Sequence, residues 1–301
     1  MVRTALEQRL NAAISNDDWV ETLAQLFIAH GLVFGHGTDN ASDEAFWLVR
    51  HLQRWQDAAW VAPPDPQLIP RVVELAERRI AERKPLAYLL GEAWFAGLRF
   101  NVDERVLVPR SPLAEIIERG FQPWCELQPH DRVLDIGTGS GCLAIAAAVH
   151  CPGVLVDATD VSAAALSVAA ANVARHALES RVRLFEADLF PRSVERYRVI
   201  MSNPPYVPES ELADLPPEYA SEPVVALAGG ATGLDPVDRI LRGAREHLEP
   251  GGVLIMEVGG GAEIFARAYP ELPVIWIEFE HGGDGVLVLA AEHLEKFARV
   301  S

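Results

Sequence analysis

Cysteine is scarce in this chain of 301 residues, and its histidines are not clustered. The three cysteines form no CxxC pair and the nine histidines are scattered, so the sequence predicts no metal centre and favours a reducing compartment. No apolar run reaches the roughly 18 to 20 residues that a membrane-spanning helix needs. The first residues lack the basic and apolar segments of a secretory signal. We therefore expect a cytoplasmic protein with no metal and no membrane segment.

Basic residues are also few. Lysine and arginine number 26 against 43 aspartates and glutamates, which gives a net charge of −17. Nucleic acids are bound largely through Lys and Arg, so this balance speaks against a protein that binds nucleic acid unaided. An acidic surface instead attracts basic partners such as ribosomal proteins, although charge of this kind also serves solubility alone. With 50% hydrophobic residues the chain can bury a sizeable core, and its length favours two domains.

A glycine-rich loop follows a short apolar strand predicted over residues 132–136. The loop, residues 137–141, reads G-T-G-S-G and leads into a helix-like segment that begins at Cys142. Glycines let the backbone approach a ligand closely, and the free N–H groups of the helix start face it. A dinucleotide-binding fingerprint needs a third glycine where Cys142 stands, so the spacing disfavours a nicotinamide site.

Two further predicted strands, residues 154–159 and 182–187, end in acidic residues. Asp160 follows the first, where a carboxylate can accept the hydroxyl protons of a ribose. The alternative is a helix N-cap, a role for which Ser162 competes. The second strand delivers Asp188 to the same edge of the predicted sheet, where open α/β sheets bind ligands.

The tetrapeptide Asn203-Pro204-Pro205-Tyr206 follows a fourth predicted strand, residues 199–201. Proline has no N–H and a fixed φ, so the carbonyls of Asn203 and Pro204 can serve as rigid acceptors beside the Asn203 side-chain oxygen. A planar NH2 group fits such acceptors, and the Tyr206 ring would cover its face. The alternative is a Pro-Pro turn between strand and helix. Glu257 ends another strand, residues 253–256, and is a candidate for accepting a proton or for a structural role.

The first ninety residues predict helices. Apolar residues recur at helical spacing over residues 42–55, with Ser42 as N-cap, and further helices are expected over residues 22–30 and 71–82. Residues 94–102 and 106–108 predict a hairpin whose turn lies at 103–105. The G-G-D-G run at 282–285 suggests a tight turn between the last two strands.

The glycine loop, with Asp135 before it, resembles motif I of class I S-adenosylmethionine-dependent methyltransferases, and N-P-P-Y resembles the (D/N/S)PP(Y/F/W) signature of amino-group methyltransferases. Over essentially the whole chain, the order of helical segment, GxxWFxGLxFxV hairpin, PR loop, D-I-G-T-G-S-G-C and N-P-P-Y resembles the protein glutamine methyltransferases that modify Gly-Gly-Gln sites. The V-P-R-S-P run at 108–112 and the G-G-D-G run resemble the branch that methylates a glutamine of large-subunit ribosomal protein L-three. The release-factor branch typically reads P-R-P-(D/E)-T-E.

The resemblance implies an α/β fold: a class I, Rossmann-like methyltransferase domain with a mixed seven-stranded sheet, a small N-terminal helical domain and a connecting β-hairpin. We place the helical substrate-recognition domain at residues 1–90, the hairpin linker at 91–112 and the methyltransferase domain at 113–301. The implied catalytic residues are Asn203, Pro204, Pro205 and Tyr206, which also bind the substrate together with Arg110 and Ser111. The implied S-adenosylmethionine-binding residues are Asp135, Gly137, Thr138, Gly139, Ser140, Gly141, Asp160, Asp188, Leu189 and Asn203.

The expected activity is methylation of a glutamine side-chain amide, with ribosomal protein L-three as partner. Within the enzyme class, a release-factor glutamine and the exocyclic amine of adenine in nucleic acid are the alternative acceptors. A nicotinamide oxidoreductase would leave N-P-P-Y without a purpose. A non-enzymatic ribosome-assembly factor would not need Asn203, Asp160 and the glycine loop together.

Overall fold

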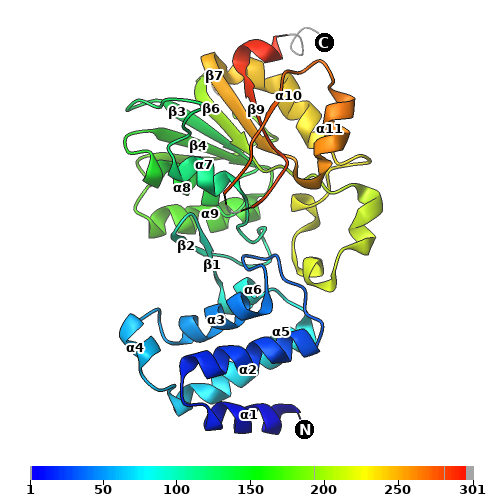
Figure 1. Ribbon diagram of the computed structural model, residues 1–301. Coiled ribbons are helices and arrows are strands. Elements are labelled where there is room, and N and C mark those ends of the chain that lie inside the picture. Colours follow the sequence, from blue (N-terminus) through cyan, green and yellow to red (C-terminus); the bar gives the residue numbers. More distant parts are fainter. Residues whose placement is uncertain (1, 193, 281, 296–301) are drawn as a thin grey trace. The chain divides into compact units, whose positions relative to one another are not determined.

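The computed structural model describes residues 2–192, 194–280 and 282–295, which form two compact units (Figure 1). The first unit comprises the chain up to Glu92 together with the distant segment Leu215–Ser221. The second comprises Ala93–Asp214 and the residues from Glu222 onward. No helix in the described ranges is both long and apolar enough to cross a bilayer.

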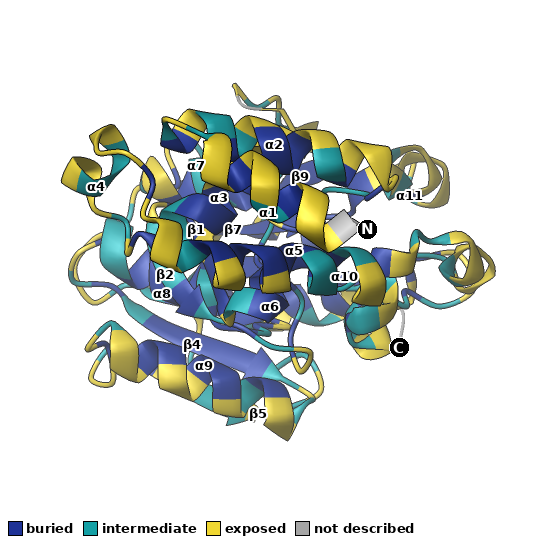
Figure 2. Ribbon diagram, turned by 90° about the horizontal axis from the view of Figure 1, so that it is seen from below, coloured by how far each residue is buried: buried dark blue, intermediate teal, exposed yellow. Residues whose placement is uncertain are grey.

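The first unit is helical. Its helices are α1 (Val2–Ala12), α2 (Asn16–Ala29), α3 (Ala41–Leu52), α4 (Asp57–Val61), α5 (Ile69–Glu82) and α6 (Leu86–Leu90). Helices α2, α3 and α5 each bury one face and expose the other (Figure 2), as expected for amphipathic helices that share a small core. Trp19, Phe27 and Leu48 are among the fully buried side chains of that core.

Two helix starts differ from the sequence expectation. The N-cap of helix α3 is Asn40, two residues before the expected Ser42, and its side chain accepts a hydrogen bond from the Asp43 N–H at 2.9 Å. Helix α2 begins at Asn16 rather than near residue 22, because Ser15 and Asp18 form a reciprocal capping box. In both helices the first residue is set by a capping side chain that accepts hydrogen bonds from free backbone N–H groups. The capping residue precedes the first apolar residue of the helix.

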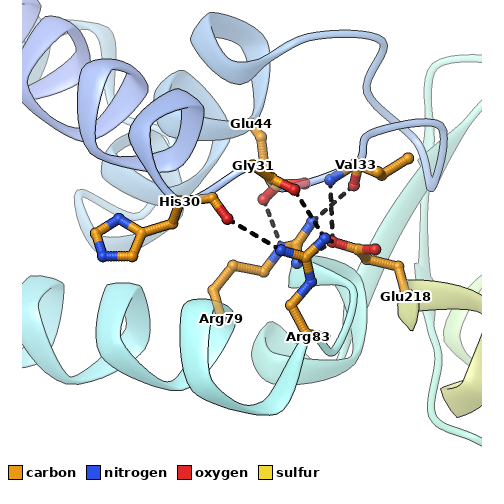
Figure 3. Close-up of polar contacts among 7 residues, drawn as sticks. All are labelled: His30, Gly31, Val33, Glu44, Arg79, Arg83 and Glu218. Carbon is orange, nitrogen blue, oxygen red and sulfur yellow. Dashed lines mark hydrogen bonds and ion pairs between the residues drawn. The ribbon is translucent and has the colours of Figure 1, made fainter. Parts of the chain in front are cut away.

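A buried ion cluster joins the segment Leu215–Ser221 to helix α5 (Figure 3). The guanidinium of Arg79, fully buried, donates to Glu44 at 2.7 Å and to Glu218 at 3.2 Å. Arg83 lies 2.8 Å from the same Glu218 oxygen, which also accepts from the Val33 N–H at 3.0 Å. Burial alone would raise the pKa of Glu218, but these donors outweigh it and the pKa is lowered. Buried charge is tolerated here because the Arg79 guanidinium and one oxygen of Glu218 each have several partners.

The second unit is built on a seven-stranded mixed sheet (Figure 1). Its spatial order is β5 (Val182–Glu186), β4 (Leu155–Asp160), β3 (Arg132–Ile136), β6 (Tyr197–Ser202), β7 (Leu248–Glu257), β9 (Val286–Ala290) and β8 (Ile275–Trp276). Strands β3 to β7 run parallel to one another, and β9 is antiparallel to both β7 and β8. The predicted fold class is confirmed.

Helices cover both faces of this sheet. Helices α8 (Cys142–His150) and α9 (Ala163–Arg175) connect β3, β4 and β5 in one direction, whereas α10 (Asp235–His247) leads into β7 in the other. Right-handed crossovers in opposite directions place their helices on opposite faces, with α7 (Leu113–Glu118) packed on α8 and α11 (Ala262–Ala268) on the α10 side. A fully buried cluster that includes Ile200, Leu254 and Ile240 joins the sheet to α10.

The β-hairpin lies earlier than expected. Strands β1 (Glu92–Phe95) and β2 (Leu98–Asn101) form a two-stranded sheet whose turn is Ala96-Gly97, with φ of 47° and 72°. Positive φ at both central residues suits a tight two-residue turn. Residues 106–108 form no strand.

The G-G-D-G run also differs from the expected tight turn. Strands β8 and β9 are joined by residues 277–285, of which Gly282, Gly283 and Gly285 have positive φ. His281 lies outside the described residues. The connection is therefore a loop longer than a two-residue hairpin turn.

Candidate active site

The parallel strands end together. In the sheet register, Ile136 of β3 pairs with Thr159 of β4 and with Ser202 of β6, and Ser202 pairs with Met256 of β7. The residues at the ends of these strands, Asp160 and Glu257, and those just after them, Gly137 and Asn203, therefore lie at one edge. Strands β3 and β6 are neighbours whose crossovers run in opposite directions. Such a switch point is where open α/β sheets bind ligands.

The glycine loop after β3 is supported from beneath by Asp135. This carboxylate is fully buried; it accepts a hydrogen bond from the Thr138 hydroxyl at 2.6 Å and another from the Ala144 N–H at 3.2 Å. Burial raises the pKa of Asp135 to about 7, although the two hydrogen bonds act in the opposite direction and lower it. Gly137 and Gly139 have φ of 73° and 54°, and a Cβ built on either would meet nothing within 4 Å. The loop thus presents bare backbone to open space.

Asp160 ties the ends of β3 and β4 together. One carboxylate oxygen accepts from the Gly139 N–H at 2.9 Å, and the other accepts from the Ser162 N–H at 2.8 Å. The N-cap of α9 is Ser162, which accepts from the Ala165 N–H. A carboxylate has further lone pairs, so Asp160 keeps acceptor capacity for a ligand.

Leu189 and Asp188 follow β5. Leu189 has φ of 71°, a strained conformation for a residue with a side chain, and the Thr159 hydroxyl donates to its carbonyl at 2.6 Å. The Asp188 carboxylate accepts from Arg239 of α10 at 2.6 Å. Both groups of that ion pair are more than half exposed, so the pair adds little stability and its members can respond to a ligand.

A cavity of about 270 Å³ lies at this edge. Seven of the residues expected in the site line it: Gly137, Gly139, Asp160, Asp188, Leu189, Asn203 and Pro205. Residues of the glycine loop, Asp160 and residues of the N-P-P-Y segment thus line one space, although they are separated by up to 68 residues in the chain.

Asn203 is oriented by the loop that contains Arg110. The Asn203 amide nitrogen donates to the Arg110 carbonyl at 3.4 Å, a long bond that leaves the side-chain oxygen as the acceptor. The Arg110 guanidinium makes a two-pronged ion pair with Glu222, both contacts at 2.6 Å, and Glu222 also accepts from the Val108 N–H. Arg110 is therefore anchored by Glu222 through its guanidinium, and its backbone carbonyl orients Asn203.

The Tyr206 side chain lies behind the cavity. Its hydroxyl donates to Glu257 at 3.1 Å, and the Ser111 hydroxyl donates to the other Glu257 oxygen at 2.5 Å. Glu257 is 5% exposed, and burial raises its pKa. Both carboxylate oxygens therefore already accept hydrogen bonds from the protein.

Several expected site residues do not line the cavity: Asp135, Thr138, Ser140, Gly141, Pro204, Tyr206, Arg110 and Ser111. Among them, Asp135 and Thr138 brace the glycine loop and Arg110 orients Asn203. Sequence reasoning in turn missed part of the lining: Leu107, Pro223, Val225, Ala226, Pro236 and Arg239. The prolines at 223 and 236 mark loop positions, but no motif in the sequence connects these residues to the glycine loop.

Comparison with known proteins agrees with the motifs. A family model described as "Methyltransferase small domain" matches residues 124–215. The ribosomal protein uL3 glutamine methyltransferase of Bordetella pertussis is 46% identical over 270 residues, which cover 87% of this chain and 90% of that protein. The protein of the same name from Neisseria meningitidis serogroup A is 42% identical over 301 residues, which cover 98% of this chain and 99% of that protein.

The chain belongs to the ribosomal protein uL3 glutamine methyltransferase family. The branch predicted from the V-P-R-S-P and G-G-D-G runs is confirmed. Among solved structures, a methyltransferase from Pyrococcus furiosus matches with a TM-score of 0.48 and 22% identity, and the match covers 65% of this chain and 89% of that one.

Proposed function

We propose that this protein transfers a methyl group from S-adenosylmethionine to the side-chain amide nitrogen of a glutamine in ribosomal protein uL3. The observation that carries the proposal is the shared cavity: Asn203 and Pro205 line it together with Gly137, Gly139 and Asp160. A donor site and an NH2 acceptor site in one space are what a methyl transfer between two bound molecules requires. Membership of the uL3 glutamine methyltransferase family supports the choice of acceptor.

The residues present fit S-adenosylmethionine. Gly137 and Gly139 face open space without a Cβ, which allows the backbone to approach the donor, and Asp160 offers a carboxylate for ribose hydroxyls. Leu189 adds an apolar surface for the adenine ring, and Asp188 lies beside it. When bound, S-adenosylmethionine supplies a methyl group on a positively charged sulfur that is a good leaving group.

A primary amide nitrogen is a poor nucleophile, because its lone pair is delocalised into the carbonyl. The Asn203 side-chain oxygen and the Pro204 carbonyl would accept the two amide hydrogens, which holds the nitrogen in place and stabilises the positive charge that develops on it. One hydrogen then leaves as a proton to water. Glu257 is not assigned to this step, since both of its oxygens accept hydrogen bonds from Ser111 and Tyr206.

The helical unit is assigned to recognition of the protein substrate. Ile14, Ile28 and Phe46 are large apolar side chains of this unit with exposed fractions of 83%, 66% and 41%. Such residues are available to a protein partner. A photo-crosslinker at position 46 should capture uL3, whereas one at the fully exposed Val194 of the other unit serves as control.

Two other acceptors compete with uL3, and one experiment separates all three. Purified protein is incubated with radiolabelled S-adenosylmethionine and, in parallel, with uL3, a peptide chain release factor and DNA, and labelled products are mapped by mass spectrometry. Label on a glutamine of uL3 is expected, and Asn203→Ala should abolish it. Label only on a release factor would reassign the substrate, and label on DNA would reject protein methylation. The net charge of −17 disfavours DNA.

A further inference from the structure

Glu257 sits between two loops of the site without lining the cavity itself. It is the last residue of β7 and follows Met256, which pairs with Ser202, the residue just before the N-P-P-Y loop. Its two oxygens are divided between the Tyr206 and Ser111 hydroxyls. A buried carboxylate needs such donors, because burial without them disfavours the charged form.

The Tyr206 ring is also confined by glycines. A Cβ at Gly259 would lie 2.6 Å from the ring atom Cε2, so the ring packs directly on that backbone. Gly259 is in turn covered by Gly285, where a Cβ would lie 2.0 Å from the Gly259 carbonyl oxygen, and the Val258 N–H donates to the Gly285 carbonyl at 2.7 Å. Gly285 of the G-G-D-G loop therefore packs against Gly259 and supports the backbone that the Tyr206 ring contacts.

The Tyr206 backbone is fixed independently. A Cβ at Gly233 would lie 2.3 Å from the Tyr206 carbonyl oxygen, and the next residue, Val207, donates through its N–H to the Leu227 carbonyl at 2.9 Å. Pro205 fixes φ immediately before Tyr206. Different contacts thus hold the backbone and the ring edge of Tyr206, and the hydrogen bond to Glu257 holds the end of its side chain.

We propose that Glu257 is a positioning residue for methyl transfer, which acts through Tyr206 and Ser111 to fix the acceptor loop. The inference rests on the function proposed above. Glu257 couples the N-P-P-Y loop to the segment that contains Arg110, whose carbonyl orients Asn203. Loss of Glu257 releases the end of the Tyr206 side chain and the Ser111 hydroxyl, and so removes the link between the two loops. Misplacement of an acceptor by about 1 Å can cost roughly 100-fold in rate.

The variants are Glu257→Gln, Tyr206→Phe and Ser111→Ala, with Glu263→Gln as matched control because Glu263 is exposed and pairs only with Arg267 among its described ion pairs. Glu257→Gln should lower kcat for uL3 by about 10- to 100-fold. The dissociation constant of S-adenosylmethionine, measured by calorimetry, should stay within about twofold. Because Glu257 and Tyr206 act as one unit, Glu257→Gln combined with Tyr206→Phe should be no slower than the slower single variant.

Three results would overturn the proposal: an unchanged kcat in Glu257→Gln, a loss of donor affinity as large as the loss of rate, or multiplicative effects of the two substitutions. If Glu257→Gln does not fold, Tyr206→Phe and Ser111→Ala remove the same hydrogen bonds one at a time and must each lower kcat.

A readout without turnover separates this proposal from the proposed function. The five tyrosines are replaced by 3-fluorotyrosine, and the Tyr206 signal is assigned by its loss in Tyr206→Phe. Glu257→Gln should shift that ¹⁹F resonance and Glu263→Gln should not. If the wild-type protein fails to methylate uL3 but the shift occurs, the proposed function fails while the contact stands. An unchanged resonance would reject the positioning role.

Discussion

Asp135 gives a prediction that the structure makes quantitative. Its carboxyl group lies beneath the glycine loop, fully buried, with one oxygen bonded to Thr138 and Ala144 and no recorded hydrogen bond to the other in the described structure. Burial raises its pKa to about 7 from the ordinary value of 3.8. Replacement by Asn keeps the shape and removes the titration.

The direction in which the free energy of unfolding changes with pH follows from the number of protons that each state binds. Between the unfolded pKa near 3.8 and the folded pKa near 7, the folded protein holds a proton that the unfolded chain has released. The free energy of unfolding therefore falls as the pH rises through this window. One pKa unit corresponds to about 1.4 kcal/mol, so Asp135 contributes a fall of roughly 2.5 kcal/mol between about pH 5 and about pH 8.

The assay is urea unfolding of wild-type protein and Asp135→Asn at both pH values, without S-adenosylmethionine. Other titrating groups are common to both proteins and cancel in the difference. The wild type should lose about 2.5 kcal/mol more than the variant on going to the higher pH. The Asn NH2 group adds a cost of about 1–3 kcal/mol if it lacks an acceptor, but that cost does not depend on pH. The same difference between the two proteins at both pH values would refute the reasoning.

Three further predictions concern the cavity and the helical unit. Asn203→Ala should lower kcat for uL3 by about 100-fold or more with calorimetric donor affinity largely intact, since the lost oxygen serves the acceptor amide; a parallel loss of donor affinity would contradict this division. Asp160→Ala should raise the S-adenosylmethionine dissociation constant by at least about tenfold. An unchanged dissociation constant, measured by calorimetry, would exclude Asp160 from the role of binding the ribose. Glu218→Ala should lower the free energy of unfolding by about 3–5 kcal/mol, because Arg79 stays buried with one partner fewer. Its control, Glu77→Ala, removes the exposed ion pair with Arg3 and should change the free energy of unfolding by less than about 1 kcal/mol.

The strands and the edge of the site could be predicted from local sequence. Each of β3 to β7 contains a short apolar run, and a parallel sheet places the residues at the ends of these runs at the same edge. Gly137, Asp160 and Asn203 were therefore expected together, and all three line the cavity. The periodicity of the first ninety residues likewise predicted helices α2, α3 and α5, although the starts of α2 and α3 were misplaced. Helices α1, α4 and α6 were not predicted.

Contacts between distant loops could not be predicted in this way. The pairs Arg110–Glu222 and Ser111–Glu257 join residues 112 and 146 positions apart, and no spacing rule connects them. The hairpin turn was misplaced because a charged run at 103–105 looks like a turn, whereas Ala96-Gly97 gains its turn from positive φ at both positions. The cavity wall at Pro223 and Val225 comes from a segment with no recognisable periodicity.

Carboxylates are frequent at this edge, and their hydrogen bonds explain how an acidic site can favour an amide as methyl acceptor. Asp160 accepts from two backbone N–H groups, Asp188 from Arg239, Glu222 from Arg110, and Glu257 from two hydroxyls. A carboxylate whose lone pairs are engaged by donors is a weaker nucleophile than a free one. Its negative charge still favours a cationic donor and the positive charge that develops on an amide nitrogen. In the function proposed above, the site would keep the field of its acidic residues while Asn203 would contribute the neutral acceptor that an NH2 group needs.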